Sequence, residues 1–155
     1  DVQIDSDLQI MLPDEYIESS EERLLLYKEL ADIETEESLT TFRNNLIDRF
    51  GKLPIEAESL LESIQLKWIC KKLGVERLVM KNGVLLAYFI NKPQSEFYQS
   101  EEFRLILNYV QNNAKNISFK EKQPKKGEEY PTLYLRFEQV KTIHEALKNL
   151  LNLLN

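Results

Sequence analysis

The sequence predicts an α+β domain, with a helical layer in its N-terminal half and a small, mainly antiparallel sheet after it. Apolar residues recur at helical spacing through residues 19–73, two pairs of β-rich runs follow, and a C-terminal amphipathic helix closes the chain. With 155 residues, 43% of them hydrophobic, the chain is long enough to bury a core. We therefore expect a single domain spanning residues 1–155.

The chain begins with an extended arm or edge strand over residues 1–13, in which apolar and polar residues alternate loosely until Pro13. Ser19 and Glu22 have the spacing of a capping box, in which each side chain bonds the other's free backbone N–H. This box predicts a helix that runs to about Ile33. The apolar stripe predicted for this helix consists of Leu24, Tyr27, Leu30 and Ala31.

Two further helices are predicted before residue 75. Apolar residues at helical spacing predict one over residues 36–50, and Gly51 stands where a left-handed C-terminal cap belongs. Pro54 suits the first turn of the next helix, because its missing N–H would have no partner there. Gly74 ends that helix. Short loops join all three predicted helices, so they form one layer.

The second half of the chain changes to strand patterns. Residues 75–81 and 84–90 are β-rich and flank Asn82-Gly83, a strong hairpin signal because both turn positions favour positive φ. A second hairpin follows, closed by a loop rich in Lys, Pro and Gly. The remaining predicted elements are a helix over residues 95–112, strands around residues 117–119 and 133–137, and a terminal helix over residues 138–154.

The net charge of −6 is distributed unevenly along the chain. Residues 14–37 hold ten acidic and two basic side chains, whereas residues 115–126 hold five lysines and one glutamate. DNA and anionic membranes attract basic surfaces, so the net charge predicts no membrane contact and no direct DNA binding. We interpret the Lys115–Lys126 segment as a solvated hairpin tip. The alternative is a nucleic-acid-binding accessory domain that uses these lysines.

No apolar run approaches the roughly 20 residues that a membrane span needs. Cys70 is the only cysteine, so an internal disulfide is excluded, and we expect a cytoplasmic location. A zinc site cannot be built from Cys70 and the single histidine, His144.

The four glycines lie too far apart in the sequence to form a phosphate-binding loop. We therefore expect no metal ligand, no cofactor-binding residue and no catalytic residue. This pattern favours a non-catalytic protein-interaction domain. A carboxylate-based nuclease is the enzymatic alternative, and it would need an apolar cleft that holds several acids.

The densest local signal is residues 47–54, where two predicted helices meet across a Gly/Pro turn. Asp48 and Arg49 bring opposite charges to this turn, and arginine is a preferred interface residue because its planar fork binds a carboxylate with two hydrogen bonds. In the alternative interpretation, Phe50 is a core residue, Gly51 is a cap, and the two charges belong to an ordinary surface.

At these residues the sequence resembles the C-terminal domain of bacterial transcription-repair coupling factors (Mfd). The resemblance rests on Tyr16-Ile17, on Arg23-Leu24 with the segment Leu26–Ala31, and on Leu46–Gly51 followed by Leu53-Pro54. It covers roughly residues 7–75, and beyond the first hairpin only the order of strands and helices agrees. The spacing between the blocks also resembles that family.

The resemblance implies a regulatory domain of a larger protein, an ATP-driven DNA translocase that removes stalled RNA polymerase and recruits excision repair. ATP and Mg would belong to the parent's motor, not to this chain. The domain would pack on the UvrB-like N-terminal module, mask UvrA binding and restrain the motor. The family's contact positions map onto Asn45, Asp48 and Arg49, where Asn45 replaces the expected acid.

Overall fold

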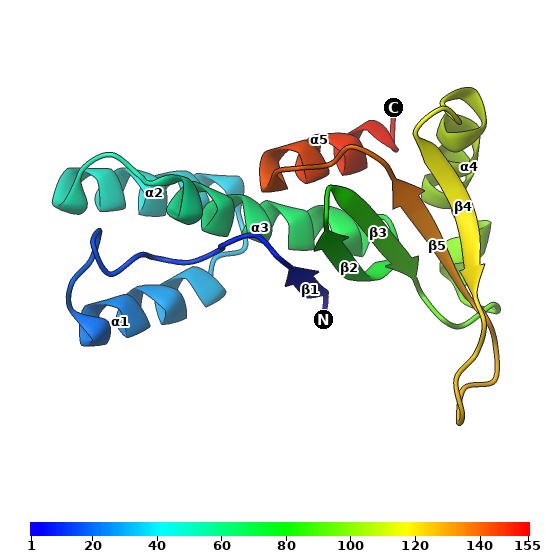
Figure 1. Cartoon of the computed structure of the whole chain (residues 1–155), viewed down its shortest axis with the longest axis horizontal. Coiled ribbons are helices and arrows are strands. Elements are labelled where there is room, and N and C mark those ends of the chain that lie inside the picture. The colour runs from blue at the N-terminus through cyan, green and yellow to red at the C-terminus, as the bar shows by residue number, and fades with distance from the viewer. The chain divides into compact units, whose positions relative to one another are not determined.

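Five α-helices and a five-stranded sheet make up the chain, which confirms the predicted α+β fold class (Figure 1). The computed structural model describes residues 1–155, which fall into two compact units. One unit comprises residues 9–63, and the other comprises residues 1–8 together with residues 64–155. The division falls inside helix α3 (Ile55–Lys72), which continues across it. None of the helices is long and apolar enough to cross a membrane.

The unit of residues 9–63 contains a helical hairpin, formed by α1 (Ser20–Ala31) and α2 (Glu36–Phe50). Capping side chains start both helices: Ser19 accepts a hydrogen bond from the backbone N–H of Glu22, and Thr35 accepts one from that of Ser38. Gly51 ends α2 with the predicted positive φ of +91°, but its ψ of −166° lies outside the left-handed helical region, so the predicted left-handed cap is wrong in that detail. The buried side chains of this hairpin are Leu26, Leu30, Leu39, Phe42 and Leu46.

The predicted apolar stripe of α1 is wrong at two positions. Leu24 and Ala31 are exposed, whereas Leu26 and Leu30 are buried. Leucines occupy three successive positions from residue 24, so spacing alone does not decide which of them faces the core. Packing against α2 decides it, because Leu26 lies in the same wall as Phe42 and Leu46.

The sheet of the other unit has the strand order β1-β2-β3-β5-β4. β1 pairs in parallel with β2, and every other neighbouring pair is antiparallel, so the sheet is mainly antiparallel as predicted. The predicted arm thus contributes an edge strand. The strands are β1 (Gln3–Ser6), β2 (Val75–Lys81), β3 (Val84–Phe89), β4 (Ile117–Lys122) and β5 (Thr132–Phe137).

Both predicted hairpins are present in this sheet. Asn82 and Gly83 turn β2 into β3 with φ values of +55° and +75°, as the Asn-Gly signal requires. β4 and β5 pair from Ile117 opposite Phe137 to Lys122 opposite Thr132. The loop that joins β4 to β5 spans residues 123–131 and contains the Lys/Pro/Gly sequence.

One face of the sheet is buried against helices. α4 (Glu101–Asn112) packs against β4, on the side of the sheet that faces away from the viewer in Figure 1. Gly74, at the end of α3, has φ +68°, and a Cβ atom there would lie 2.5 Å from the Phe97 ring. The strand side chains of this core include Leu78, Met80, Leu85, Ala87, Phe89, Leu135 and Phe137.

Two predicted helix boundaries are wrong. The helix predicted over residues 95–112 is interrupted at Ser100, which closes the short 3₁₀ helix η1 (Glu96–Gln99) and caps α4 by accepting a hydrogen bond from the N–H of Phe103. The terminal helix α5 (Ile143–Asn152) begins five residues later than predicted, because Gln139 has φ +57° and Thr142 is the cap.

Candidate protein-docking groove

A shallow groove runs between α1 and α2 within residues 9–63. Its deeper part is a cavity of about 230 Å³ with the buried side chains Leu26, Phe42 and Leu46 in its wall. A second cavity of about 430 Å³ continues it toward the turn between the helices, and Glu29, Phe42 and Asn45 line both. We call this feature the α1–α2 groove.

The three predicted contact residues lie together at this groove. Asn45, Asp48 and Arg49 are spaced by three and four positions on α2, so they share one face of the helix. All three line the deeper cavity, and all three are exposed. The groove therefore has an apolar wall, and the three predicted contact residues form its polar rim.

Asp48 and Arg49 differ in the contacts that their side chains make within the chain. Arg49 forms an ion pair with Glu22 of α1, and its guanidinium lies 4.7 Å from the centre of the Phe50 ring. Its side chain nevertheless stays 51% exposed. Asp48 makes no hydrogen bond or ion pair, so its carboxylate is fully available to solvent or to a partner.

Several other residues of the family-like blocks hold the fold. The Tyr16 hydroxyl donates to the carbonyl oxygens of Gly51 at 2.7 Å and Leu46 at 3.2 Å, and burial raises the pKa of that hydroxyl. The Arg23 guanidinium donates to the carbonyl oxygen of Ile17 at 2.5 Å. These contacts join the chain before α1 to its neighbours, which gives Tyr16 and Arg23 an architectural role.

An ion pair that the sequence did not predict joins α2 to α3 inside the same unit. Arg43 donates to both carboxylate oxygens of Glu58, at 2.5 and 2.6 Å. The pKa of Arg43 is raised, mainly by this hydrogen-bonded partner. Fifteen positions separate the two residues, so no helical spacing could have indicated the pair.

Acidic side chains dominate the unit that carries the groove. Residues 9–63 contain fourteen Asp and Glu against five Lys and Arg, a net charge of −9. Glu29, which the sequence did not single out, lines both cavities of the groove, and Glu37 lines the second. A partner surface that complements the α1–α2 groove would therefore be basic around an apolar centre.

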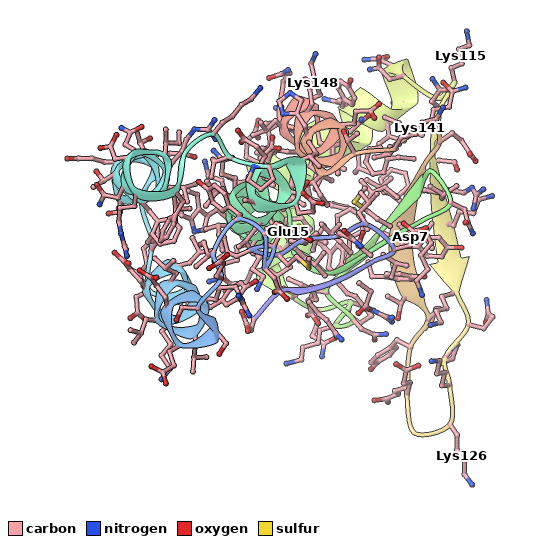
Figure 2. All side chains as sticks on the ribbon, turned by 60° about the vertical axis from the view of Figure 1, so that its left-hand side comes forward. Asp7, Glu15, Lys115, Lys126, Lys141 and Lys148 are labelled. Atoms are coloured by element: carbon pink, nitrogen blue, oxygen red, sulfur yellow. The ribbon has the colours of Figure 1, made fainter.

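The predicted basic segment is not a single patch. Figure 2 shows Lys126 at the tip of the loop between β4 and β5, and Lys115 at the opposite end of β4. Glu121 stands between Lys120 and Lys122 along β4, so its side chain points to the other face of the sheet. Only part of the segment, Lys125 and Lys126, occupies the predicted hairpin tip.

No three His, Cys, Asp or Glu side chains gather into a set that could hold a metal ion. Cys70 is fully buried in α3, and burial raises its pKa to about 12. Its thiol therefore stays protonated at neutral pH, and a protonated thiol is a poor nucleophile.

Comparisons with known proteins agree on one family. The family model named TRCF domain matches residues 6–100. Transcription-repair-coupling factors of Staphylococcus epidermidis and Borreliella burgdorferi are 35% identical over 126 residues and 30% identical over 137 residues, covering 76% and 84% of this chain. The chain spans 11% and 12% of the length of these two relatives.

A solved structure shares the fold. The crystal structure of a C-terminal domain of transcription-repair coupling factor superposes with a TM-score of 0.69, at 24% sequence identity, and covers 98% of this chain and 89% of that chain. The family model covers more than half of the chain and includes the whole α1–α2 groove. The chain therefore belongs to the TRCF domain family, the C-terminal domain of transcription-repair coupling factors.

Proposed function

We propose that this chain is a non-catalytic regulatory domain of an ATP-dependent transcription-repair coupling factor in the bacterial cytoplasm. Its α1–α2 groove docks on the UvrB-like N-terminal module of the same protein. Docking masks the surface that binds UvrA and restrains the motor until RNA polymerase is engaged. ATP and Mg act in the motor of the parent protein, and this chain takes no cofactor.

The observation that best supports this proposal is the position of Asp48. Its carboxylate is exposed, makes no hydrogen bond or ion pair within the chain, and stands at the rim of a groove with an apolar wall. Typical interfaces combine an apolar centre with a polar rim, which is the arrangement of Leu26 and Phe42 beside Asn45 and Asp48. A surface carboxylate with no structural role is free to serve recognition.

The docked state must also open, which limits its strength. Each exposed charge pair contributes about 0–1 kcal/mol, and polar faces between domains separate readily. A ligand shifts such an equilibrium only by the difference between its affinities for the two states. A groove with a polar rim, such as the α1–α2 groove, suits a contact that polymerase binding must release.

The proposal is tested by binding this chain to the separately produced UvrB-like module of the same parent. Isothermal titration should give a salt-sensitive affinity, because charges at the rim are screened within about 10 Å at 0.1 M salt. Asp48→Lys should weaken binding by up to about tenfold, or about 1.4 kcal/mol, because the reversal replaces an attraction with a repulsion of similar size. In the intact parent, the same substitution should raise UvrA binding in the absence of polymerase.

Glu102→Lys is the matched control, since Glu102 is an exposed acid on α4 outside the groove. It makes the same change of charge and should leave the affinity unchanged. Equal binding by the Asp48→Lys and Glu102→Lys proteins would remove the groove from the proposal.

A further inference from the structure

The face of the sheet opposite the buried core carries tyrosines and basic side chains. Side chains alternate along a strand, so the neighbours of the buried residues Leu85, Ala87, Phe89, Leu135 and Phe137 point to this other face. We call it the open sheet face. Its polar and aromatic members include Arg77, Tyr88, Lys120, Lys122, Tyr134 and Arg136, none of which is buried, together with the acidic side chain of Asp5 on β1.

Strand register aligns four of these residues in one row across the sheet. Arg77 of β2 stands opposite Tyr88 of β3, Tyr88 opposite Tyr134 of β5, and Tyr134 opposite Lys120 of β4. The two tyrosine rings have centroids 4.9 Å apart and are tilted by 37°. The row is thus a pair of adjacent aromatic rings with a cation at each end.

Two cations lie close to the Tyr88 ring. The guanidinium of Arg77 lies 5.8 Å and the ammonium of Lys122 lies 5.6 Å from the centre of the Tyr88 ring. Arg77 pairs with Asp5 at 2.9 Å, and Arg136 pairs with Glu138 at 2.7 Å. Lys120 and Lys122 have no carboxylate within ion-pair distance, and the pKa of Lys122 is lowered chiefly by the charge of Lys125.

Charge is segregated between the two units of the chain. Residues 1–8 and 64–155 contain fifteen Lys and Arg against twelve Asp and Glu, a net charge of +3, whereas residues 9–63 carry −9. The net charge of the whole chain therefore conceals a basic unit. For this reason the expectation of no direct DNA binding, which rested on the total charge, does not extend to the open sheet face.

We propose that the open sheet face binds single-stranded nucleic acid, with bases stacked on Tyr88 and Tyr134 and phosphates held by the lysines of β4. Aromatic rings on a sheet, flanked by cations, are the general arrangement by which proteins hold unpaired bases. Paired bases inside a duplex have no free face to offer the rings. An acidic peptide would satisfy the lysines and leave both rings without a stacking partner.

The test is a fluorescence anisotropy titration of the whole 155-residue chain. The probes are fluorescein-labelled oligothymidine and oligouridine of about 12 nucleotides, a length that spans a typical single-strand site. A duplex of the same length and a Glu-rich peptide complete the set. We expect micromolar binding of at least one single strand at about 50 mM salt, weakened at about 200 mM. Comparing the two single strands distinguishes DNA from RNA.

Substitutions assign the binding to the open sheet face. Tyr134→Ala should weaken binding by at least about fivefold, because a base stacked on an aromatic ring contributes that much or more. Tyr134→Phe keeps the ring and should retain binding. Lys120→Glu should weaken binding more than Lys126→Glu, which makes the same change at the loop tip. The exposed Lys120 gives a variant that folds even where Tyr134→Ala does not.

The proposal is overturned by any of three results. One is the absence of single-strand binding at about 100 μM protein and low salt, a concentration at which even non-specific contacts register. The second is equal affinity for the duplex, or binding of the Glu-rich peptide alone. The third is binding that Tyr134→Ala and Lys120→Glu leave intact while Lys126→Glu abolishes it.

Discussion

At the scale of single residues, the family-like blocks divide into residues that hold the fold and residues that face solvent. Tyr16 and Arg23 bond backbone carbonyls, and Gly51 supplies the positive φ that ends α2. The side chains of Asn45 and Asp48 do not stabilise the fold in this way and line the groove instead. Arg49 belongs to both groups, because it pairs with Glu22 and stays half exposed.

The divided role of Arg49 predicts that Glu22 competes with a docking partner for its guanidinium. Glu22→Gln removes the charge of the competitor and keeps the backbone N–H of residue 22, which donates to the Ser19 hydroxyl. We expect binding to the UvrB-like module to tighten by up to about fivefold, the equivalent of about 1 kcal/mol for an exposed pair. Titration calorimetry measures this change.

The control for Glu22→Gln is Glu101→Gln, which frees Arg104 on α4 from an exposed pair of the same kind. That substitution should not alter binding. Weaker binding by the Glu22→Gln protein would show that Glu22 itself contacts the partner, contrary to the prediction.

Cys70 predicts a loss of stability at high pH. Above the ordinary thiol pKa near 9, the unfolded chain releases the Cys70 proton, whereas the folded chain keeps it until about pH 12. The unfolded state then binds fewer protons, so the free energy of unfolding falls with rising pH by about 1.4 kcal/mol per unit in that window. The contribution is fully present below pH 9.

Other groups also titrate above pH 9, so the measurement compares urea unfolding of the wild-type chain with that of Cys70→Ala between pH 8 and about 11. The difference in stability between the two proteins should shrink as the pH rises. A difference that stays constant over this range would contradict the burial of a protonated thiol.

At the scale of secondary-structure elements, capping side chains decide where helices begin. α5 starts at Ile143 because the Thr142 hydroxyl accepts a hydrogen bond from the N–H of Glu145 at 3.0 Å, while the Glu145 carboxylate accepts one from the N–H of Lys141 at 3.2 Å. Apolar spacing extends further back to Val140, which is why the helix was predicted to start earlier. The capping hydrogen bonds, and not the apolar spacing, therefore set the residue at which α5 begins.

Thr142→Ala should therefore destabilise the chain by about 1 kcal/mol, the usual cost of removing an N-cap. Chemical denaturation monitored by circular dichroism measures the change. Thr41→Ala is the matched control, since the Thr41 hydroxyl only donates to the carbonyl oxygen of Glu37 inside α2 and is exposed. It should be neutral or slightly stabilising, because alanine is the better helix former. Equal losses in both proteins would argue against the cap.

At the scale of the whole molecule, the single domain over residues 1–155 stays a prediction, and the two compact units make it testable. α3 is one uninterrupted helix of 18 residues that belongs to both units. Helix formation is cooperative, so melting either half of α3 removes hydrogen bonds that support the other half. This continuity predicts that the units unfold together.

Coincident transitions are the signature of such cooperative unfolding. Trp68 is the only tryptophan and lies in the unit of residues 64–155, so its fluorescence follows that unit, whereas far-ultraviolet circular dichroism follows all the helices. Urea midpoints from the two signals should agree. Separate midpoints would establish two independently folding domains.

Much of the fold could be predicted from the sequence because its signals are local. The N-cap at Ser19, the positive φ of Gly51 and the Asn82-Gly83 turn each act within a few residues, and each is found where it was predicted. The reciprocal bond of the predicted capping box is absent, and the Glu22 carboxylate pairs with Arg49 instead. The identity of the groove residues was predictable only through the resemblance. Composition and spacing left Asp48 and Arg49 as possible ordinary surface charges.

The sequence by itself determined the α+β class, the order of the elements and the family, since these depend on periodicity, turn chemistry and motif spacing. Only the tertiary structure decided which leucine of α1 faces the core, that β1 joins the sheet in parallel, and that Tyr88 and Tyr134 stand side by side. These outcomes depend on pairing between distant segments, such as Gln3 of β1 with Arg77 of β2. Strand register and helix facing follow from which distant surfaces bury each other, and no local pattern encodes that choice.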